Sequence, residues 1–164
     1  MRMVDTSCSL ERLDSLIEGA WSQWPSPLRL VVVDYAGLVS LTRSTSPYER
    51  ASVVATELKN LAKRHHVALL VLYQLSRAGG TGGEAVTLSM ARDSGVVEEA
   101  CDFALGVWRP ELSDELDDDD RAELAGQFKV RVLKNRNRRV PLIPAVLRFD
   151  GATMRITSPT EVAR

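Results

Sequence analysis

Two polar residues stand directly after apolar runs that predict buried strands. Asp34 follows the run at residues 28–33, and Gln74 follows the run at residues 67–73. In an open α/β sheet, the carboxyl ends of parallel strands meet at the edge where ligands bind. A carboxylate there can hold magnesium through water, although strands also end in Asp because it favours turns. The spacing alone leaves both interpretations of Asp34 open, and a lone Gln at this position is more often an ordinary loop residue.

A cluster of cations follows later in the chain, and its second half, residues 134–139, lies between two predicted strands. Residues 129–139 contain no acid and six bases, namely Lys129, Arg131, Lys134, Arg136, Arg138 and Arg139. Packed cations repel one another and are stabilised by meeting phosphate. The alternative is a solvated turn whose charge balances residues 111–123, which hold eight acids and one base. Composition alone leaves phosphate binding and a solvated turn equally open.

The overall composition predicts a folded protein without a membrane segment. A chain of 164 residues suits one domain, and its 45% hydrophobic content excludes wholesale disorder. The net charge of −1 gives no global basic field for nucleic acid. The longest apolar runs are far shorter than the roughly 20 residues that span a bilayer. No secretion signal is evident, and we expect a cytoplasmic location. Cys8 and Cys101 lack the spacing of a disulfide scaffold or a zinc site.

Alternating helix and strand patterns would position these residues. Residues 9–24 predict a helix with one apolar face, made of Leu10, Leu13, Ile17, Ala20 and Trp21. Ser46 and Glu49 form a capping box that predicts a helix over residues 46–64. Residues 28–34 and 67–73 are expected as parallel strands covered on both faces, with 102–108 as a third core strand. A strand, a helix and another strand in this order predict a crossover unit.

The C-terminal third predicts antiparallel structure. Residues 127–133 alternate apolar and polar side chains, as a half-exposed strand does. Two more strands are expected at residues 140–149 and 153–156, joined by a turn at Asp150-Gly151. The acidic segment, about residues 109–126, is expected as an exposed loop or a solvated helix. The predicted class is α/β, with a mostly parallel sheet flanked by helices and a C-terminal antiparallel hairpin.

Four segments, which include Asp34, Gln74 and most of the basic residues, follow one another along the chain. They are VVVDYAGL at 31–38, YQLSR at 73–77, RDSGVVEEACD at 92–102 and VLKNRNRR at 132–139. Together they resemble the C-terminal motor domain of DnaB-type replicative helicases, which is a RecA-like hexameric ATPase. The resemblance covers about residues 4–157. It implies a single, partial RecA-like P-loop NTPase domain over residues 1–164.

The resemblance implies a role for each matching residue. Asp34 would hold magnesium through water as the Walker B acid, and Gln74 would sense the γ-phosphate of ATP. A second set would contact the backbone of single-stranded DNA, namely Arg92, Asp93 and Gly95. Lys134 and Arg136 match the pair that would reach the γ-phosphate of a neighbouring subunit, with Arg136 as the arginine finger. Arg138, which the family lacks, is expected to add a phosphate contact beside them. A finger acting in trans implies like subunits in a hexameric ring.

The chain departs from the family pattern in ways that bear on activity. It contains no G-x-x-x-x-G-K-[ST] motif, which in the family precedes the equivalent of residue 1. Arg138-Arg139 stand where the family usually has Gly-Pro, and Asp93 replaces Glu. We therefore expect a helicase motor fragment that is inactive alone and uses ATP and magnesium only with a P-loop-containing chain. The alternatives are a non-catalytic module that binds single-stranded DNA or a helicase, and a fragment without present function.

Overall fold

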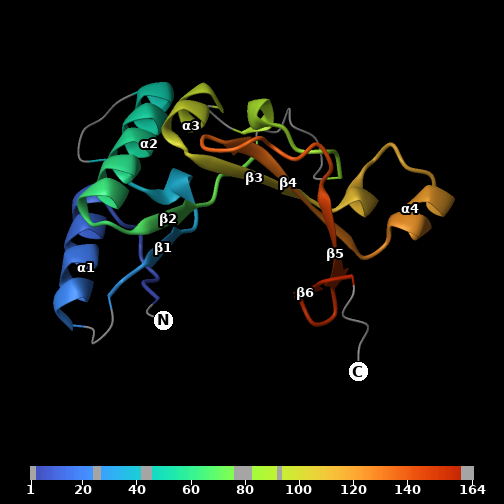
Figure 1. Cartoon of the computed structure of the whole chain (residues 1–164), viewed down its shortest axis with the longest axis horizontal. Coiled ribbons are helices and arrows are strands. Elements are labelled where there is room, and N and C mark those ends of the chain that lie inside the picture. The colour runs from blue at the N-terminus through green and yellow to red at the C-terminus, as the bar shows by residue number, and fades with distance from the viewer. Residues whose placement is uncertain (1–2, 24–26, 42–45, 76–82, 92–93, 160–164) are drawn as a thin grey trace. The chain divides into compact units, whose positions relative to one another are not determined.

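The computed structural model describes residues 3–23, 27–41, 46–75, 83–91 and 94–159 (Figure 1). The chain divides into two compact units, each with its own sheet. The N-terminal unit comprises Met1–Gln74 and Gly95–Ala100, and its sheet has two strands. The C-terminal unit comprises Leu75–Ser94 and Cys101–Arg164, and its sheet has four strands. The α/β class is confirmed, and the antiparallel part is a full sheet rather than the hairpin we expected.

The N-terminal unit is built around the predicted crossover. Its elements are α1 (Leu10–Gln23), β1 (Leu30–Val33), α2 (Pro47–Arg64), β2 (Ala68–Val71) and, from Gly95 onward, α3 (Ser94–Ala100). β1 and β2 pair in parallel, in a register that runs from Leu30 opposite Ala68 to Val33 opposite Val71. Because α2 joins two neighbouring parallel strands, the crossover expected from the sequence is confirmed.

The start of α2 is the capping box that the sequence predicts. The Glu49 backbone N–H donates to Ser46 Oγ at 3.3 Å, and the Ser46 N–H donates to Glu49 Oε2 at 3.0 Å. These two bonds satisfy donors that a helix N-terminus leaves without partners. The hydrogen bond from the Ser46 backbone, followed by that from its hydroxyl, lowers the pKa of Glu49. The cap is therefore charge-assisted.

The core of the N-terminal unit lies between its helices and one face of its sheet. Val39, Val54, Leu58 and Leu61 form a buried cluster in which Leu58 is only 2% exposed. The partly buried side chains packed against it are Leu10, Leu13, Val33, Leu41, Leu69 and Val71. The apolar face expected for α1 is confirmed at Ile17 and Ala20, but Trp21 is 41% exposed. Trp21 lies in the last turn of α1 and is not part of this cluster.

The other face of the β1–β2 pair is open within the described residues. Its apolar side chains are Leu30, Val32, Leu70 and Leu72, each between 40% and 55% exposed. The expectation that these strands are covered on both faces is therefore wrong for this structure. An apolar run indicates that a strand suits burial, but it does not say which element supplies the cover.

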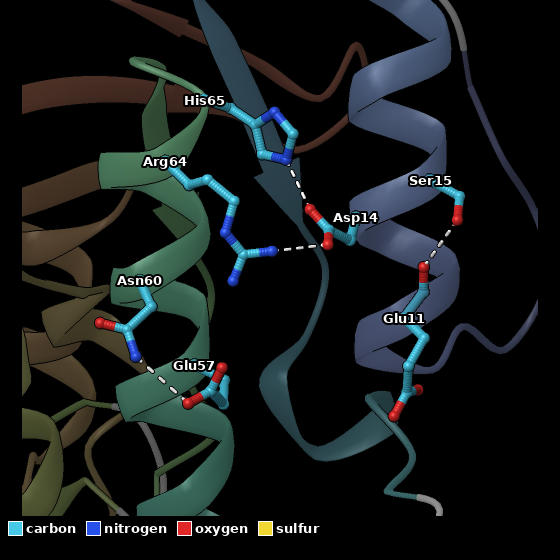
Figure 2. Close-up of polar contacts among 7 residues, drawn as sticks. All are labelled: Glu11, Asp14, Ser15, Glu57, Asn60, Arg64 and His65. Carbon is cyan, nitrogen blue, oxygen red and sulfur yellow. Dashed lines mark hydrogen bonds and ion pairs between the residues drawn. The ribbon is translucent and has the colours of Figure 1, made fainter.

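A polar contact joins α1 to the end of α2 (Figure 2). Arg64 Nη1 lies 2.6 Å from Asp14 Oδ2, and His65 Nε2 lies 2.5 Å from Asp14 Oδ1. One carboxylate on α1 thus contacts two consecutive residues at the C-terminal end of α2. The other bonds drawn in Figure 2 lie within single helices, from the Ser15 hydroxyl to the Glu11 carbonyl and from the Asn60 amide to Glu57.

The C-terminal unit is a sheet in the order β3-β4-β5-β6, antiparallel throughout. Its strands are β3 (Phe103–Trp108), β4 (Gln127–Asn135), β5 (Ala145–Asp150) and β6 (Arg155–Thr157). The predicted strand at 102–108 is confirmed as β3, but it pairs with β4 and not with a parallel sheet. The strand predicted from residue 140 begins only at Ala145, because Pro141 and Pro144 lack the N–H that a ladder needs.

The acidic segment forms short helices beside the start of β4. A 3₁₀ turn at Pro110–Leu112 is followed by α4 (Asp118–Leu124), whose N-cap Asp117 accepts the Asp120 N–H at 2.8 Å. Glu111 joins this segment to the sheet. It pairs with Arg109, accepts the Gly126 N–H at 2.5 Å, and its carbonyl accepts from Arg121 at 2.6 Å. Arg109 in turn lies 4.4 Å from the centre of the Phe149 ring.

Replacing Leu58 should cost far more stability than replacing an apolar residue on the open face. Leu58→Ala should lower the free energy of unfolding by about 2–5 kcal/mol, because it leaves a cavity in the buried cluster. Leu70→Ala, at a side chain that is 50% exposed, should cost about 1 kcal/mol or less. Urea unfolding followed by circular dichroism measures both. Equal losses for the two variants would contradict the one-sided core.

Glu111→Gln should make stability less dependent on pH. Burial raises the pKa of Glu111, but the bonds from Arg109 and the Gly126 N–H outweigh it and leave the pKa below the ordinary 4.5. The carboxylate therefore contributes stability above about pH 4.5, and this is lost as pH falls through the folded-state pKa. At pH 7 the variant should be less stable by about 2 kcal/mol.

The difference in the free energy of unfolding between wild type and Glu111→Gln should decrease as the pH is lowered below 4.5. Urea unfolding at a series of pH values measures this difference. Glu115→Gln is the matched control, since that residue is exposed on the same segment. If the difference in the free energy of unfolding stays constant from pH 7 to pH 3, the charge of Glu111 does not stabilise the acidic segment.

Candidate functional site

The structure brings Asp34 and Gln74 to one edge of the N-terminal sheet. Leu72 N–H donates to the Val33 carbonyl at 3.0 Å, and Ala36 N–H donates to the Leu72 carbonyl at 3.0 Å. These bonds continue the pairing of the two chain segments past the ends of β1 and β2. Asp34 and Gln74 thus both follow the carboxyl ends of neighbouring parallel strands, and both are exposed.

Asp34 fits part of a magnesium site. Among the residues that the structure describes, no three His, Cys, Asp or Glu side chains gather as a metal site would need. Asp34 therefore offers a single carboxylate at this edge. Magnesium in nucleotide sites commonly takes one or two protein ligands and completes its shell with phosphates and water. The carboxylate suits that share, and the remaining ligands would come from a nucleotide, water and other residues.

The predicted DNA-contacting set lies only partly within the described residues. Arg92 and Asp93 fall outside them, so their arrangement stays a prediction. Gly95 lies in the first turn of α3 and is exposed. Apart from its chain neighbours and its own helix, nothing among the described residues lies within 4 Å of the position where its Cβ would stand, so that side of Gly95 has open space.

The basic residues predicted to contact phosphate lie at the end of β4. Lys134 is within the strand, opposite Ala104 of β3, and Arg136 is the first residue after the strand. The Arg136 N–H donates to the Asp102 carbonyl at 2.9 Å, and Arg136 Nη1 lies 3.1 Å from Asp102 Oδ1. Arg138 is exposed in the turn that follows. β4 therefore carries these cations to the surface of the C-terminal unit.

The turn after β4 is stabilised although the family's Gly-Pro is missing there. Asn137 N–H donates to Asn135 Oδ1 at 3.1 Å, so the Asn135 side chain closes the first step of the turn. Such a bond replaces the backbone bond of an ordinary turn. Together with the bond from Arg136 to Asp102, it holds both ends of the Asn135–Asn137 stretch.

The sequence patterns did not single out Asp102 as the partner of Arg136. It ends the RDSGVVEEACD segment, where nothing local indicates a contact with the basic turn, residues 136–139. The available signals were the apolar run at 103–108 and the alternation at 127–133, which predict two strands. The register in which these strands pair depends on contacts between segments far apart in the chain.

The acidic residues 111–123 precede β4 and include α4, which lies at the opposite end of the strand from the turn that follows Asn135 (Figure 1). The six bases of residues 129–139 are divided between the two: Lys129, Arg131 and Lys134 lie within β4, and Arg136, Arg138 and Arg139 follow it. Nine residues of strand span about 30 Å. That is more than the Debye length of about 8 Å at physiological ionic strength. Screening over this length favours phosphate binding by the cations after β4, and the charge-balanced turn stays the alternative prediction.

In the part of the chain that the structure describes, every helix is too short or too polar to cross a membrane.

Sequence comparison finds relatives of this chain among DnaB-like helicases. The family model described as DnaB-like helicase C terminal domain matches residues 4–158. The chain is 30% identical over 138 residues to the replicative DNA helicase DnaB of Mycoplasma pneumoniae. It is also 30% identical over 125 residues to a probable replicative DNA helicase of Trieres chinensis. These matches cover 79% and 74% of this chain but only 28% and 27% of the relatives.

Solved structures with a similar fold are helicase ATPase domains. A DnaB-like replicative helicase, solved for its interactions with primase, superimposes with a TM-score of 0.80 at 22% identity, covering 94% of this chain and 37% of that one. A solved ATPase domain gives a TM-score of 0.79 at 21% identity and covers 94% of this chain and 53% of that one. At these identities the likeness establishes the fold, which is RecA-like. With the family model matching nearly the whole chain, this protein belongs to the DnaB-like helicase C-terminal domain family.

Proposed function

We propose that this chain is the distal part of a DnaB-like helicase motor, which acts when a P-loop is supplied from elsewhere. The carrying observation is the position of Arg136. It stands at the end of a strand, is pinned by its backbone N–H, and has a side chain that is 51% exposed. A guanidinium held at the surface in this way suits an arginine finger, because it can reach a phosphate on a neighbouring subunit.

The N-terminal unit would supply the other nucleotide contacts. Asp34 would hold magnesium through water, and Gln74 would respond to the γ-phosphate from the next strand end. ATP and magnesium, when bound, would supply the phosphoryl group and neutralise the charge that develops on it. Asp34 and Gln74 share one sheet edge. Gln74 would therefore respond to the loss of the γ-phosphate close to the magnesium held at Asp34.

Single-stranded DNA is the proposed track of this motor. Arg92, Asp93 and Gly95 correspond to the DNA-contacting loop, in which a cation and open backbone N–H groups would hold phosphates. Such contacts read the backbone and not the bases. The partners we propose are therefore single-stranded DNA, like subunits arranged in a ring, and a chain or chain segment that carries the P-loop.

The chain alone should not hydrolyse ATP, whereas the chain together with a DnaB-like P-loop half should. In that mixture Arg136→Lys should reduce turnover on the order of 1,000-fold, because lysine keeps the charge but loses the planar fork. Asp34→Asn should also reduce it. A coupled phosphate-release assay measures turnover, and Arg155→Lys is the matched control, at an exposed arginine of β6.

Two outcomes would overturn the proposed motor role. ATP turnover by the pure chain that Asp34→Asn abolishes would show that no second half is needed. Turnover by the mixture that Arg136→Lys leaves unchanged would show that the residue is not the finger.

Binding of single-stranded DNA should depend on Arg92 and on salt. With oligo-dT and the reconstituted pair, Arg92→Gln should weaken binding and lower the slope of log K against log salt by about 0.7, the value for one phosphate contact on a single strand. Fluorescence anisotropy measures this, with Arg29→Gln as the matched control, at an exposed arginine directly before β1. Equally tight, ATP-independent binding by the chain alone would favour the non-catalytic module instead of the motor.

A further inference from the structure

A β-bulge sets which residue of β4 faces Asp102. Leu105 pairs with Val132, but Ala104 pairs with Lys134, so Leu133 is an extra residue on β4. If the register of the Leu105–Val132 pair continued without the bulge, Asn135 would lie opposite Asp102. With the bulge, Phe103 pairs with Asn135 and the next pair is Asp102 with Arg136. Bulges of this kind re-aim the side chains that follow them.

Packing holds the bulge in place. A Cβ placed on Gly106 would lie 3.0 Å from Leu133 Cδ1 and 3.0 Å from Val86 Cβ. Gly106 and Val86 are both buried. The extra residue of β4 therefore rests over a glycine whose missing side chain makes room for it. The register that brings Asp102 to Arg136 is thus built into the core of the C-terminal unit.

The contact between Asp102 and Arg136 has two separate parts. The backbone bond, 2.9 Å from Arg136 N to Asp102 O, positions the main chain and does not involve the carboxylate. The ion pair, 3.1 Å from Nη1 to Oδ1, joins side chains that are 51% and 55% exposed. Exposed ion pairs are weak and readily exchanged. A polyphosphate offers more negative charge than one carboxylate and can displace it.

Resting on the proposed function, we infer that Asp102 is a positioning residue for Arg136. In the absence of a phosphate, its carboxylate holds the guanidinium beside Asp102 at the end of β4. When a phosphate arrives, the guanidinium exchanges Asp102 for the phosphate oxygens, while the backbone bond keeps the turn in place. Asp102 thus competes with phosphate for Arg136.

Removing the carboxylate should therefore tighten phosphate binding. With inorganic tripolyphosphate as the probe at low salt, Asp102→Asn should bind about two- to five-fold more tightly than wild type. NMR titration of the arginine Nε–Hε signals gives the dissociation constants. It also shows whether the signal of Arg136 shifts when tripolyphosphate binds. Asp102→Glu, which restores a carboxylate, should return binding toward the wild-type value. Asp102→Ser is a second carboxylate-free variant with the same expected direction.

Asp114→Asn controls for the change in net charge, because it removes one exposed carboxylate elsewhere in the C-terminal unit. It should tighten binding less than Asp102→Asn does. Equal tightening by the two variants, or none by either carboxylate-free Asp102 variant, would overturn the inference.

Arg136→Gln separates this inference from the proposed function. If tripolyphosphate binds that variant as tightly as wild type, Arg136 does not contact phosphate and the finger role fails with it. If Arg136→Gln weakens binding several-fold but the Asp102 variants do not tighten it, the positioning role of Asp102 alone is wrong.

Discussion

The pairing of β3 with β4 is the constraint on which the C-terminal unit depends. β4 is the longest strand, and it is hydrogen-bonded to β3 along one side and to β5 along the other. The bulge at Leu133, seated over Gly106, sets the register in which the last residues of β4 emerge. Where the basic turn stands, and which carboxylate it meets, both follow from this one packing contact. The chemistry proposed for the turn therefore rests on the apolar core beneath it.

Local signals in the sequence predicted the elements well. Ser46 and Glu49 lie three residues apart, so the cap they form needs no other part of the chain, and α2 begins where they place it. The apolar runs before Asp34 and Gln74 identified two parallel strands and the shared edge. The ordered motifs identified the family, since each is a short segment whose residues are adjacent.

Contacts between distant segments could not be predicted in the same way. Asp14 meets Arg64 and His65 across about 50 residues of chain, and Asp102 meets Arg136 across 34 positions. Nothing in the local pattern distinguishes these acids from other exposed carboxylates. The open face of β1 and β2 was missed for a related reason, because hydrophobicity reports a tendency to be buried and not the presence of a cover.

The charge separation along β4 also bears on how the protein behaves during purification. A net charge of −1 suggests weak retention on any ion exchanger. Resins, however, respond to the patch that faces them, and here a strongly acidic region precedes β4 while the basic residues lie along that strand and after its end. We expect the chain to be retained by both anion and cation exchangers near neutral pH. Its electrophoretic mobility would still be close to that of a nearly neutral particle.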